Sequence, residues 1–168
     1  MSNNTNENQV EDQVMIEATE ETTMPEIEST EVEMTEEDML KNLQAKRMGT
    51  FKVDLSYSDA TYLRNMLDKT TYKGPQQAYL LIISKLELSQ VCEMLKNEPK
   101  DTRHPVELTS ATIESVSFFM NQKEGVGVDS AQKLFAASMV LRPAIGEINK
   151  LDQELTNLSN RLEIEKQK

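Results

Sequence analysis

An internal repeat limits what this chain can fold into more than any other feature of its sequence. Residues 53–95 and 106–148 align without a gap at an offset of 53 residues. The aligned pairs include Val53 with Val106, Leu55 with Leu108, Leu63 with Val116, Met66 with Phe119, Gly74 with Gly127, Ala78 with Ala131 and Leu81 with Leu134. Few pairs are identical, so the alternative is a chance match between two similar helical hairpins. In both cases one hairpin cannot bury its apolar face alone, whereas two hairpins can cover each other.

The local patterns predict strand, helix, loop and helix in each half. Residues 51–55 alternate apolar and polar side chains, which is the period of an extended strand. Ser56 and Asp59 form a capping-box pattern that opens a helix, and Gly74 with Pro75 begins the next helix, over about 75–97. A chain with ten methionines and no tryptophan should pack helices on helices. We therefore predict a mainly α fold, a duplicated helical hairpin with short extended segments.

A strongly acidic segment precedes the repeat. Residues 1–45 hold 13 acidic residues and one base, Lys41, whereas the rest of the chain holds 16 acids and 17 bases. Residues 1–34 show no sustained period, so they are predicted to be a disordered acidic tail that keeps the chain soluble. The alternative is a binding motif around the apolar residues 14–16 that orders on a partner. A capping pattern at Thr35 predicts a helix near residues 36–47 and the start of a helical body over 35–142.

The C-terminal part of the sequence carries another helical signal. Arg142-Pro143 predicts a new helix or a kink, because proline fits only the first turn of a helix without distortion. Apolar residues then alternate spacings of three and four, an a/d seam that includes Ile148, Leu151, Leu155, Leu158 and Leu162. We predict that residues 143–168 form a coiled-coil-like helix that makes the chain a homo-oligomer, or a helix packed along the body. Antiparallel pairing is favoured because it brings Glu147 towards Arg161.

The sequence offers no convergent set of catalytic or metal-binding residues. Cys92 shares the apolar stripe of the second predicted helix with Leu81 and Ile82, which indicates a buried thiol, and His104 falls in a polar loop. The glycines around residues 125–127 lack the other residues of a nucleotide-binding loop, and the carboxylates concentrate in the predicted tail. We therefore expect no enzymatic activity, no metal and no cofactor.

Charge and hydropathy also restrict the partners and the location. No basic leader and no run of about 18 apolar residues is present, so neither a signal peptide nor a membrane span is predicted. A single cysteine suits a reducing cytoplasm. Nucleic acid is not the expected partner, because the acidic tail would repel phosphate and the nearly neutral body lacks clustered bases.

One group of residues suggests a small anionic ligand. Tyr57 at a helix start, with Tyr72, Lys73 and Gly74 in the loop after that helix, offers an aromatic face, a cation and exposed backbone donors. Such a combination suits the stacking of a base and the binding of a phosphate. The alternative is that these are ordinary surface tyrosines and a solvated lysine.

The pattern of residues 55–86 resembles small helical-hairpin proteins of tailed bacteriophages. The resemblance rests on Leu55-Ser56, Leu63, Leu67-Asp68-Lys69-Thr70-Thr71-Tyr72-Lys73-Gly74, Ala78, Leu81 and Lys85-Leu86. It implies a structural or assembly protein that acts through protein–protein contacts in the host cytoplasm or in the virion. Some phage proteins of this build are anti-defence sponges that hold cyclic nucleotides in oligomeric cages, so an oligomeric binding module is the second implied function. An enzyme is the third and least favoured interpretation.

Overall fold

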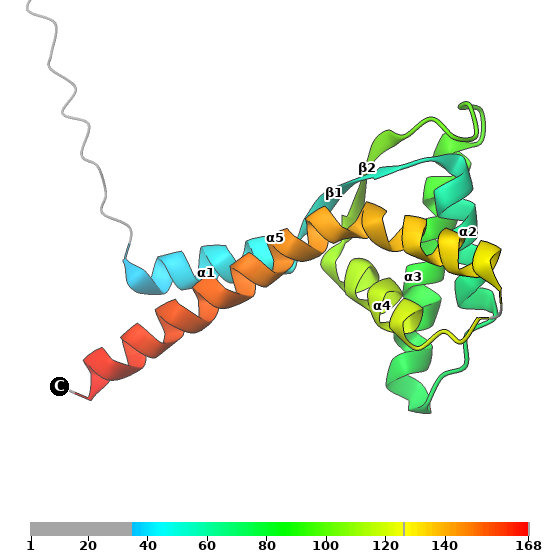
Figure 1. Ribbon diagram of the computed structural model, residues 1–168. Coiled ribbons are helices and arrows are strands. Elements are labelled where there is room, and N and C mark those ends of the chain that lie inside the picture. Colours follow the sequence, from blue (N-terminus) through cyan, green and yellow to red (C-terminus); the bar gives the residue numbers. More distant parts are fainter. Residues whose placement is uncertain (1–34, 126, 168) are drawn as a thin grey trace, which may run out of the picture. The chain divides into compact units, whose positions relative to one another are not determined.

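The fold is mainly helical, as predicted (Figure 1). The computed structural model describes residues 35–125 and 127–167, so the predicted disordered tail, residues 1–34, lies outside the described residues. In chain order the elements are α1 (Glu36–Arg47), β1 (Thr50–Leu55), α2 (Tyr57–Asp68), α3 (Gly74–Leu95), β2 (His104–Thr109), α4 (Ser110–Asn121) and α5 (Val128–Lys166). Each half of the predicted repeat thus contains one strand followed by two helices.

Short polar side chains fix where three of the helices begin. The hydroxyl of Thr35 accepts a hydrogen bond from the backbone N–H of Asp38 (3.2 Å), and α1 starts at Glu36. Ser56 and Asp59 form the predicted reciprocal capping box at α2 (3.0 and 3.2 Å). The hydroxyl of Thr109 caps α4 by accepting from the N–H of Thr112. These bonds satisfy backbone donors that have no partner within the helix, which is why the capping patterns located the boundaries well.

The two strands pair as an antiparallel ribbon with alternating burial. The inward side chains of β1 are Phe51, Val53 and Leu55, and those of β2 are Val106 and Leu108. At the centre of the ribbon Val53 pairs with Val106, the residue that lies 53 positions later in the sequence. An axis of local two-fold symmetry through this pair would therefore exchange the two halves of the chain.

The secondary structure and the burial follow the same offset of 53 residues. Adding 53 to the bounds of α2 gives the bounds of α4. Residues that are buried in both halves at this offset include Ala60 and Ile113, Leu63 and Val116, Met66 and Phe119, Leu67 and Met120, Leu88 and Leu141, and Leu95 and Ile148. These correspondences favour the predicted repeats over 53–95 and 106–148, and we expect the two units to superpose on direct overlay.

The structure differs from the sequence-based expectation at Pro143. A new helix or a kink was expected there. The new helix, with its boundary between residues 142 and 143, is wrong, because α5 runs from Val128 to Lys166 with Pro143 inside it, whereas the kink stays a prediction. Leu141, Ala144 and Ile148 are buried in the core on both sides of the proline. Their packing offsets the loss of one backbone hydrogen bond, which is the main cost of an interior proline. The helix that closes the second repeat therefore also forms the C-terminal helix.

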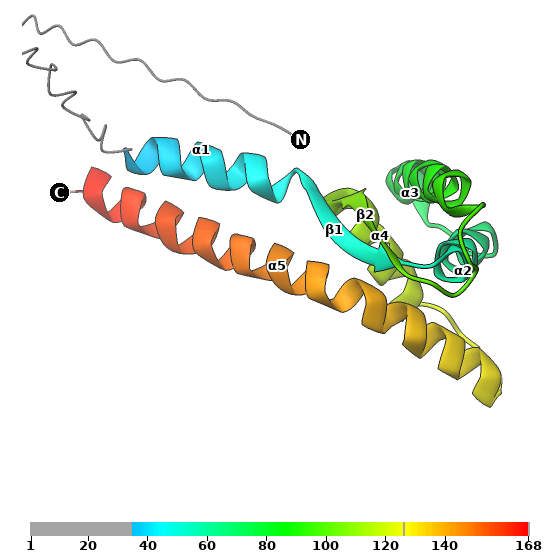
Figure 2. The same cartoon turned by 90° about the horizontal axis from the view of Figure 1, so that it is seen from above.

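The helices α1 and α5 lie side by side and antiparallel in both views (Figure 2). An ion pair joins Glu36 at the start of α1 to Arg161 near the end of α5 (3.6 Å). Another joins Arg47 at the end of α1 to Asp152 (2.6 Å). We call α1 together with residues 148–166 of α5 the arm. The arm extends from the ribbon-centred core that α2, α3, α4 and the first half of α5 build.

Two glycines at helix starts have a backbone conformation that other residues rarely adopt. Gly74 and Gly127, which correspond at the 53-residue offset, have φ of 77° and 89°, and a Cβ atom at either would meet nothing within 4 Å. Changing either to alanine should therefore lower the free energy of unfolding by about 1–2 kcal/mol through backbone strain alone. Gly146 is the matched control, because it lies within α5 in open space. Gly146→Ala should raise stability by about 0.5–1 kcal/mol in the same urea titration.

Candidate interaction surfaces

Within residues 35–125 and 127–167 no three His, Cys, Asp or Glu side chains are grouped so that they could hold a metal ion. Cys92 is buried, as predicted, beside the hydroxyl of Thr61 (3.8 Å). His104 was expected in a loop, but it opens β2 and its Nε2 lies 3.5 Å from a carboxylate oxygen of Glu98. Across the same described ranges no helix has the length and apolar character needed to cross a bilayer.

A groove of about 450 Å³ lies between the start of α2 and the first half of α5. Tyr57 and Tyr62 contribute aromatic side chains to it, and Lys100 and Lys133 contribute amino groups. The floor includes the small residues Ala136 and Ala137. Burial raises the pKa of the Tyr62 phenol, so this group stays protonated at neutral pH and can donate a hydrogen bond. Asp59 also lines the groove, and its carboxylate pairs with Arg103 (3.4 Å). With that charge paired, two aromatic rings and two lysines around a groove of this size could accommodate a small aromatic anion.

The structure does not gather the four residues that the sequence suggested for such a ligand. Tyr57 lines the groove, but Tyr72, Lys73 and Gly74 follow the opposite end of α2. The 12 residues of α2 separate them by about 18 Å. The N–H of Lys73 also donates to the side chain of Gln77 (2.7 Å). The sequence did not indicate Lys133, because no local pattern places a residue 76 positions after Tyr57 in the same groove. The ligand-binding role of all these residues stays a prediction.

An uncovered apolar face lies on α3. Tyr79, Ile82 and Leu86, spaced by three and four residues, are 64%, 56% and 60% exposed. No charged residue occurs in the sequence from Gly74 to Ser84, and the next residue, Lys85, forms an ion pair with Asp68 of α2. We call Tyr79, Ile82 and Leu86 the α3 face. Large apolar side chains that are exposed next to one another on a helix are typical of a contact surface.

The seam predicted from Ile148 to Leu162 is shared between the core and the arm. Ile148 belongs to the main core, and Leu151 packs partly against it. Leu158 is buried outside that core, while Leu155 and Leu162 are half-buried. Helix α1 of the same chain covers part of this seam, so the seam residues have contacts within one chain. Their predicted role in oligomerisation stays a prediction.

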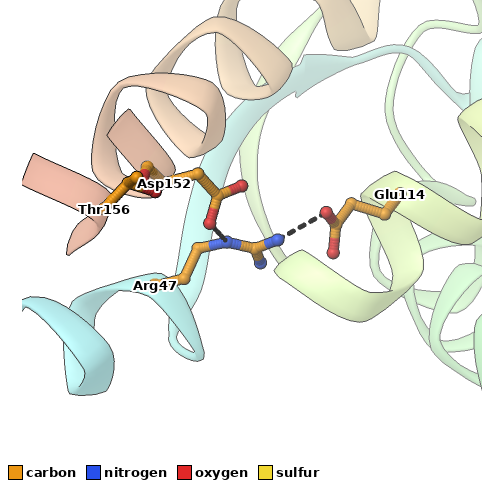
Figure 3. Close-up of polar contacts among 4 residues, drawn as sticks. All are labelled: Arg47, Glu114, Asp152 and Thr156. Atoms are coloured by element: carbon orange, nitrogen blue, oxygen red, sulfur yellow. Dashed lines mark hydrogen bonds and ion pairs between the residues drawn. The ribbon is translucent and has the colours of Figure 1, made fainter. Parts of the chain in front are cut away.

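Arg47 ties three helices together where the arm meets the core (Figure 3). Its Nε donates to Asp152 of α5 (2.6 Å), and its Nη2 donates to Glu114 of α4 (2.5 Å). Thr156 lies one turn after Asp152 on α5, and its hydroxyl donates to the carbonyl oxygen of Asp152 (2.8 Å). The hydrogen bond to Asp152 is the largest cause that raises the pKa of Arg47 above its ordinary value, so the guanidinium remains charged.

Replacing Arg47 with alanine should lower the free energy of unfolding by about 1–2 kcal/mol. Hydrogen bonds to charged groups contribute about 1.5–3 kcal/mol, and this value is reduced here because both carboxylates are about half exposed. Arg47→Lys is the control, since an ammonium keeps the charge but cannot present two donor directions in a fixed fork. Urea unfolding should place it between the alanine variant and the wild type. Equal stability of all three would show that solvent screening cancels both pairs.

The outer face of the ribbon has the geometry but not the charge of a DNA-reading surface. A two-stranded ribbon fits the major groove of DNA, where its outward side chains can contact base edges. Here the outward positions include one base, Lys52, and two acids, Asp54 and Glu107. Because phosphate contacts provide most of the affinity for DNA, a ribbon with more acids than bases is poorly suited to it.

Comparison with known proteins gives no relative from which a role could be transferred. No family model, no curated protein and no solved structure matches the chain. Functional inference therefore rests on the surfaces described above.

Proposed function

We propose that this protein is a non-enzymatic structural or assembly protein that acts through protein–protein contacts, as the resemblance to tailed-phage proteins implies. The α3 face is its principal contact surface. The observation that carries the proposal is the exposure of Tyr79, Ile82 and Leu86 on one side of α3, the first two within the segment from Gly74 to Ser84 that has no charged residue. Burying three such side chains on a partner would contribute about 1.5–3 kcal/mol for each one that becomes fully buried.

The composition of the α3 face indicates the chemistry of its partner. Because the segment from Gly74 to Ser84 has no charge, charge pairing cannot be the basis of recognition. The matching surface is a neutral apolar face, and the α3 face of another copy meets this requirement, because a neutral patch is complementary to itself about a two-fold axis. A lipid surface fits less well, since helices that lie on membranes carry Lys and Arg along the polar side.

Sedimentation velocity over about 1–100 μM protein tests the proposal. A two-fold contact through the α3 face alone closes at a dimer, so larger species need a second self-complementary surface on the same chain. We expect the wild type to form species larger than a dimer as concentration rises, and the pair Ile82→Lys and Leu86→Lys to remove them. The pair Gln122→Lys and Gln132→Lys adds the same charge at two exposed positions away from α3, one just after α4 and one in α5, and should leave assembly unchanged. Assembly of the wild type that the α3 variant does not weaken would overturn the role of this face. A wild type that stays monomeric at the highest concentration would overturn the proposed function.

The groove at Tyr57 supports a second candidate, an oligomeric module that sequesters a small anionic ligand such as a cyclic nucleotide. Its test is a thermal-shift panel of nucleotides and cyclic nucleotides. A ligand present at 100 times its dissociation constant should stabilise the protein by about 2.7 kcal/mol. Lys133→Glu, within the groove, should abolish that shift, whereas Lys73→Glu, beyond the far end of α2, should not. No shift from any member of the panel would remove this candidate.

A further inference from the structure

The arm is a two-helix layer in which Leu158 is buried but most of the other seam residues keep contact with water. None of the residues of α1 is buried. The seam leucines Leu40, Leu43, Leu155 and Leu162 are only half-buried, although they lie between the two helices. In a four-helix arrangement these positions would be interior. The arm therefore has the burial pattern expected of two helices taken from a four-helix bundle.

One side of the arm is hollowed along its length. A groove of about 630 Å³ runs between α1 and α5, with an apolar floor that includes Met39, Leu43 and Leu158. Charged residues edge this floor: Glu154 and Arg161 on α5, and Lys46 on α1. A second hollow, of about 330 Å³, lies between other residues of the same two helices, including Leu40 and Leu155.

We propose that the larger groove is filled by the same groove of a second copy, with the two arms antiparallel about a two-fold axis, so that a four-helix layer forms. This inference rests on the proposed function, because it names one partner in the assembly. It differs from the α3 face in location and in chemistry. The arm interface combines an apolar floor with charged edges, and these charges determine the direction of pairing.

The charges on α5 suit an antiparallel copy. Glu154 and Arg161 are seven residues apart and therefore lie on one side of the helix. A two-fold axis that crosses α5 midway between Asn157 and Leu158 places Glu154 opposite the partner's Arg161, and Arg161 opposite the partner's Glu154. One contact thus creates two equivalent pairs of opposite charge.

The charges on α1 lead to the same arrangement. Its first turn contains Glu36, Glu37 and Asp38, and its last turn contains Lys46 and Arg47. Within the chain, Glu36 pairs with Arg161 and Arg47 pairs with Asp152. The point where the two-fold axis crosses α5 therefore lies beside the middle of α1. The axis then brings Lys46 over the acidic first turn of the other α1. Both helices of the arm thus meet opposite charges in the antiparallel copy.

The size of the arm predicts a weak dimer. Residues 148–166 extend over about 28 Å, the 12 residues of α1 extend over about 18 Å, and each helix is about 10 Å wide, so each copy would cover roughly 450 Å². The total of roughly 900 Å² is in the range of weak, transient interfaces. We therefore expect a dissociation constant in the micromolar range.

Charge reversal tests the proposed pairs directly. Glu154→Arg and Arg161→Glu each place like charges at both symmetry-related pairs and should weaken the dimer by about ten-fold or more in sedimentation equilibrium. An equimolar mixture of these two variants should form a heterodimer of near wild-type affinity, because both pairs then carry opposite charges. Glu163→Arg and Lys150→Glu make the same charge changes outside the groove and should leave the dimer intact.

The outcomes separate the arm from the α3 face. Each variant is first checked by thermal melting, since the ion pair of Arg161 with Glu36 is lost in Arg161→Glu. A dimer that neither reversal weakens, or a mixture that does not regain affinity, overturns the antiparallel arm contact even if larger assemblies persist. Loss of the larger assemblies in the α3 variant with a retained dimer supports the arm contact. Monomeric wild type at 100 μM would overturn both proposals.

Discussion

Replacing Phe119 with alanine should lower the free energy of unfolding by about 3–5 kcal/mol, which is the usual range for removing a buried aromatic side chain. Phe119 is the largest of the fully buried side chains in the described chain. It lies on α4, in contact with the core that both repeats share. Because single domains are stable by only about 5–15 kcal/mol, this variant should be close to unfolding at 37 °C.

The adjacent residue provides a matched control for this prediction. Phe118 lies in the same helix but is 42% exposed, and its ring packs edge-to-face on that of Phe119 with the ring centroids 5.3 Å apart. Phe118→Ala removes the same atoms and the same ring contact, yet it leaves little cavity, so it should cost about 1 kcal/mol. Chemical denaturation of both variants measures the difference. Similar losses in the two would mean that the ring contact, rather than burial, accounts for the stability.

The elements that the sequence predicted well are those that local contacts determine. The start of α1 depends on Thr35 and Asp38, and the start of α2 depends on Ser56 and Asp59, which are three residues apart in each case. The alternation in residues 51–55 reflects a ribbon with one buried face. The repeat offset also carried information beyond local structure, since the aligned pairs Leu63 with Val116 and Met66 with Phe119 are buried in both halves, although Ala78 and Ala131 are not.

The elements that the sequence did not predict depend on contacts between distant residues. Nothing near Pro143 indicates that Leu141 and Ala144 will hold the helix continuous, because their burial comes from other elements. Ile82 was placed on the buried stripe of its helix with Leu81, but it is 56% exposed while Leu81 packs against the core. The run of six successive apolar residues from Ala78 to Ile83 has no single favoured face, so periodicity could not decide which of them would be covered.

The candidate surfaces show the same division. The seam from Ile148 to Leu162 was visible in the sequence, because heptad spacing is local. The sequence did not show that α1 covers part of this seam, because Glu36 and Arg161 are far apart in the chain and no pattern links them. The sequence likewise indicated Tyr57 but not Lys133 as a residue of the groove, because Lys133 comes from the second repeat.

Deleting residues 1–48 should unfold the end of α5, whereas deleting residues 1–34 should leave the melting temperature nearly unchanged. The shorter deletion removes a segment with no basic residue and no sustained period, which is not expected to contribute to the core. The longer deletion also removes the 12 residues of α1 and exposes Leu155, Leu158 and Leu162. An isolated helical segment of about 18 residues is only marginally stable in water, so residues after Ile148 should fray.

Circular dichroism of the two truncated chains measures this effect. Losing α1 alone accounts for 12 helical residues, and fraying of residues 149–166 would add about 18 more to the loss. The remaining core should still melt cooperatively, because Ile148 and the residues before it pack against the ribbon and α4. A loss limited to the 12 residues of α1, unchanged by dilution, would mean that the end of α5 is stable alone. The same limited loss that grows on dilution would mean that another copy covers the exposed seam in place of α1.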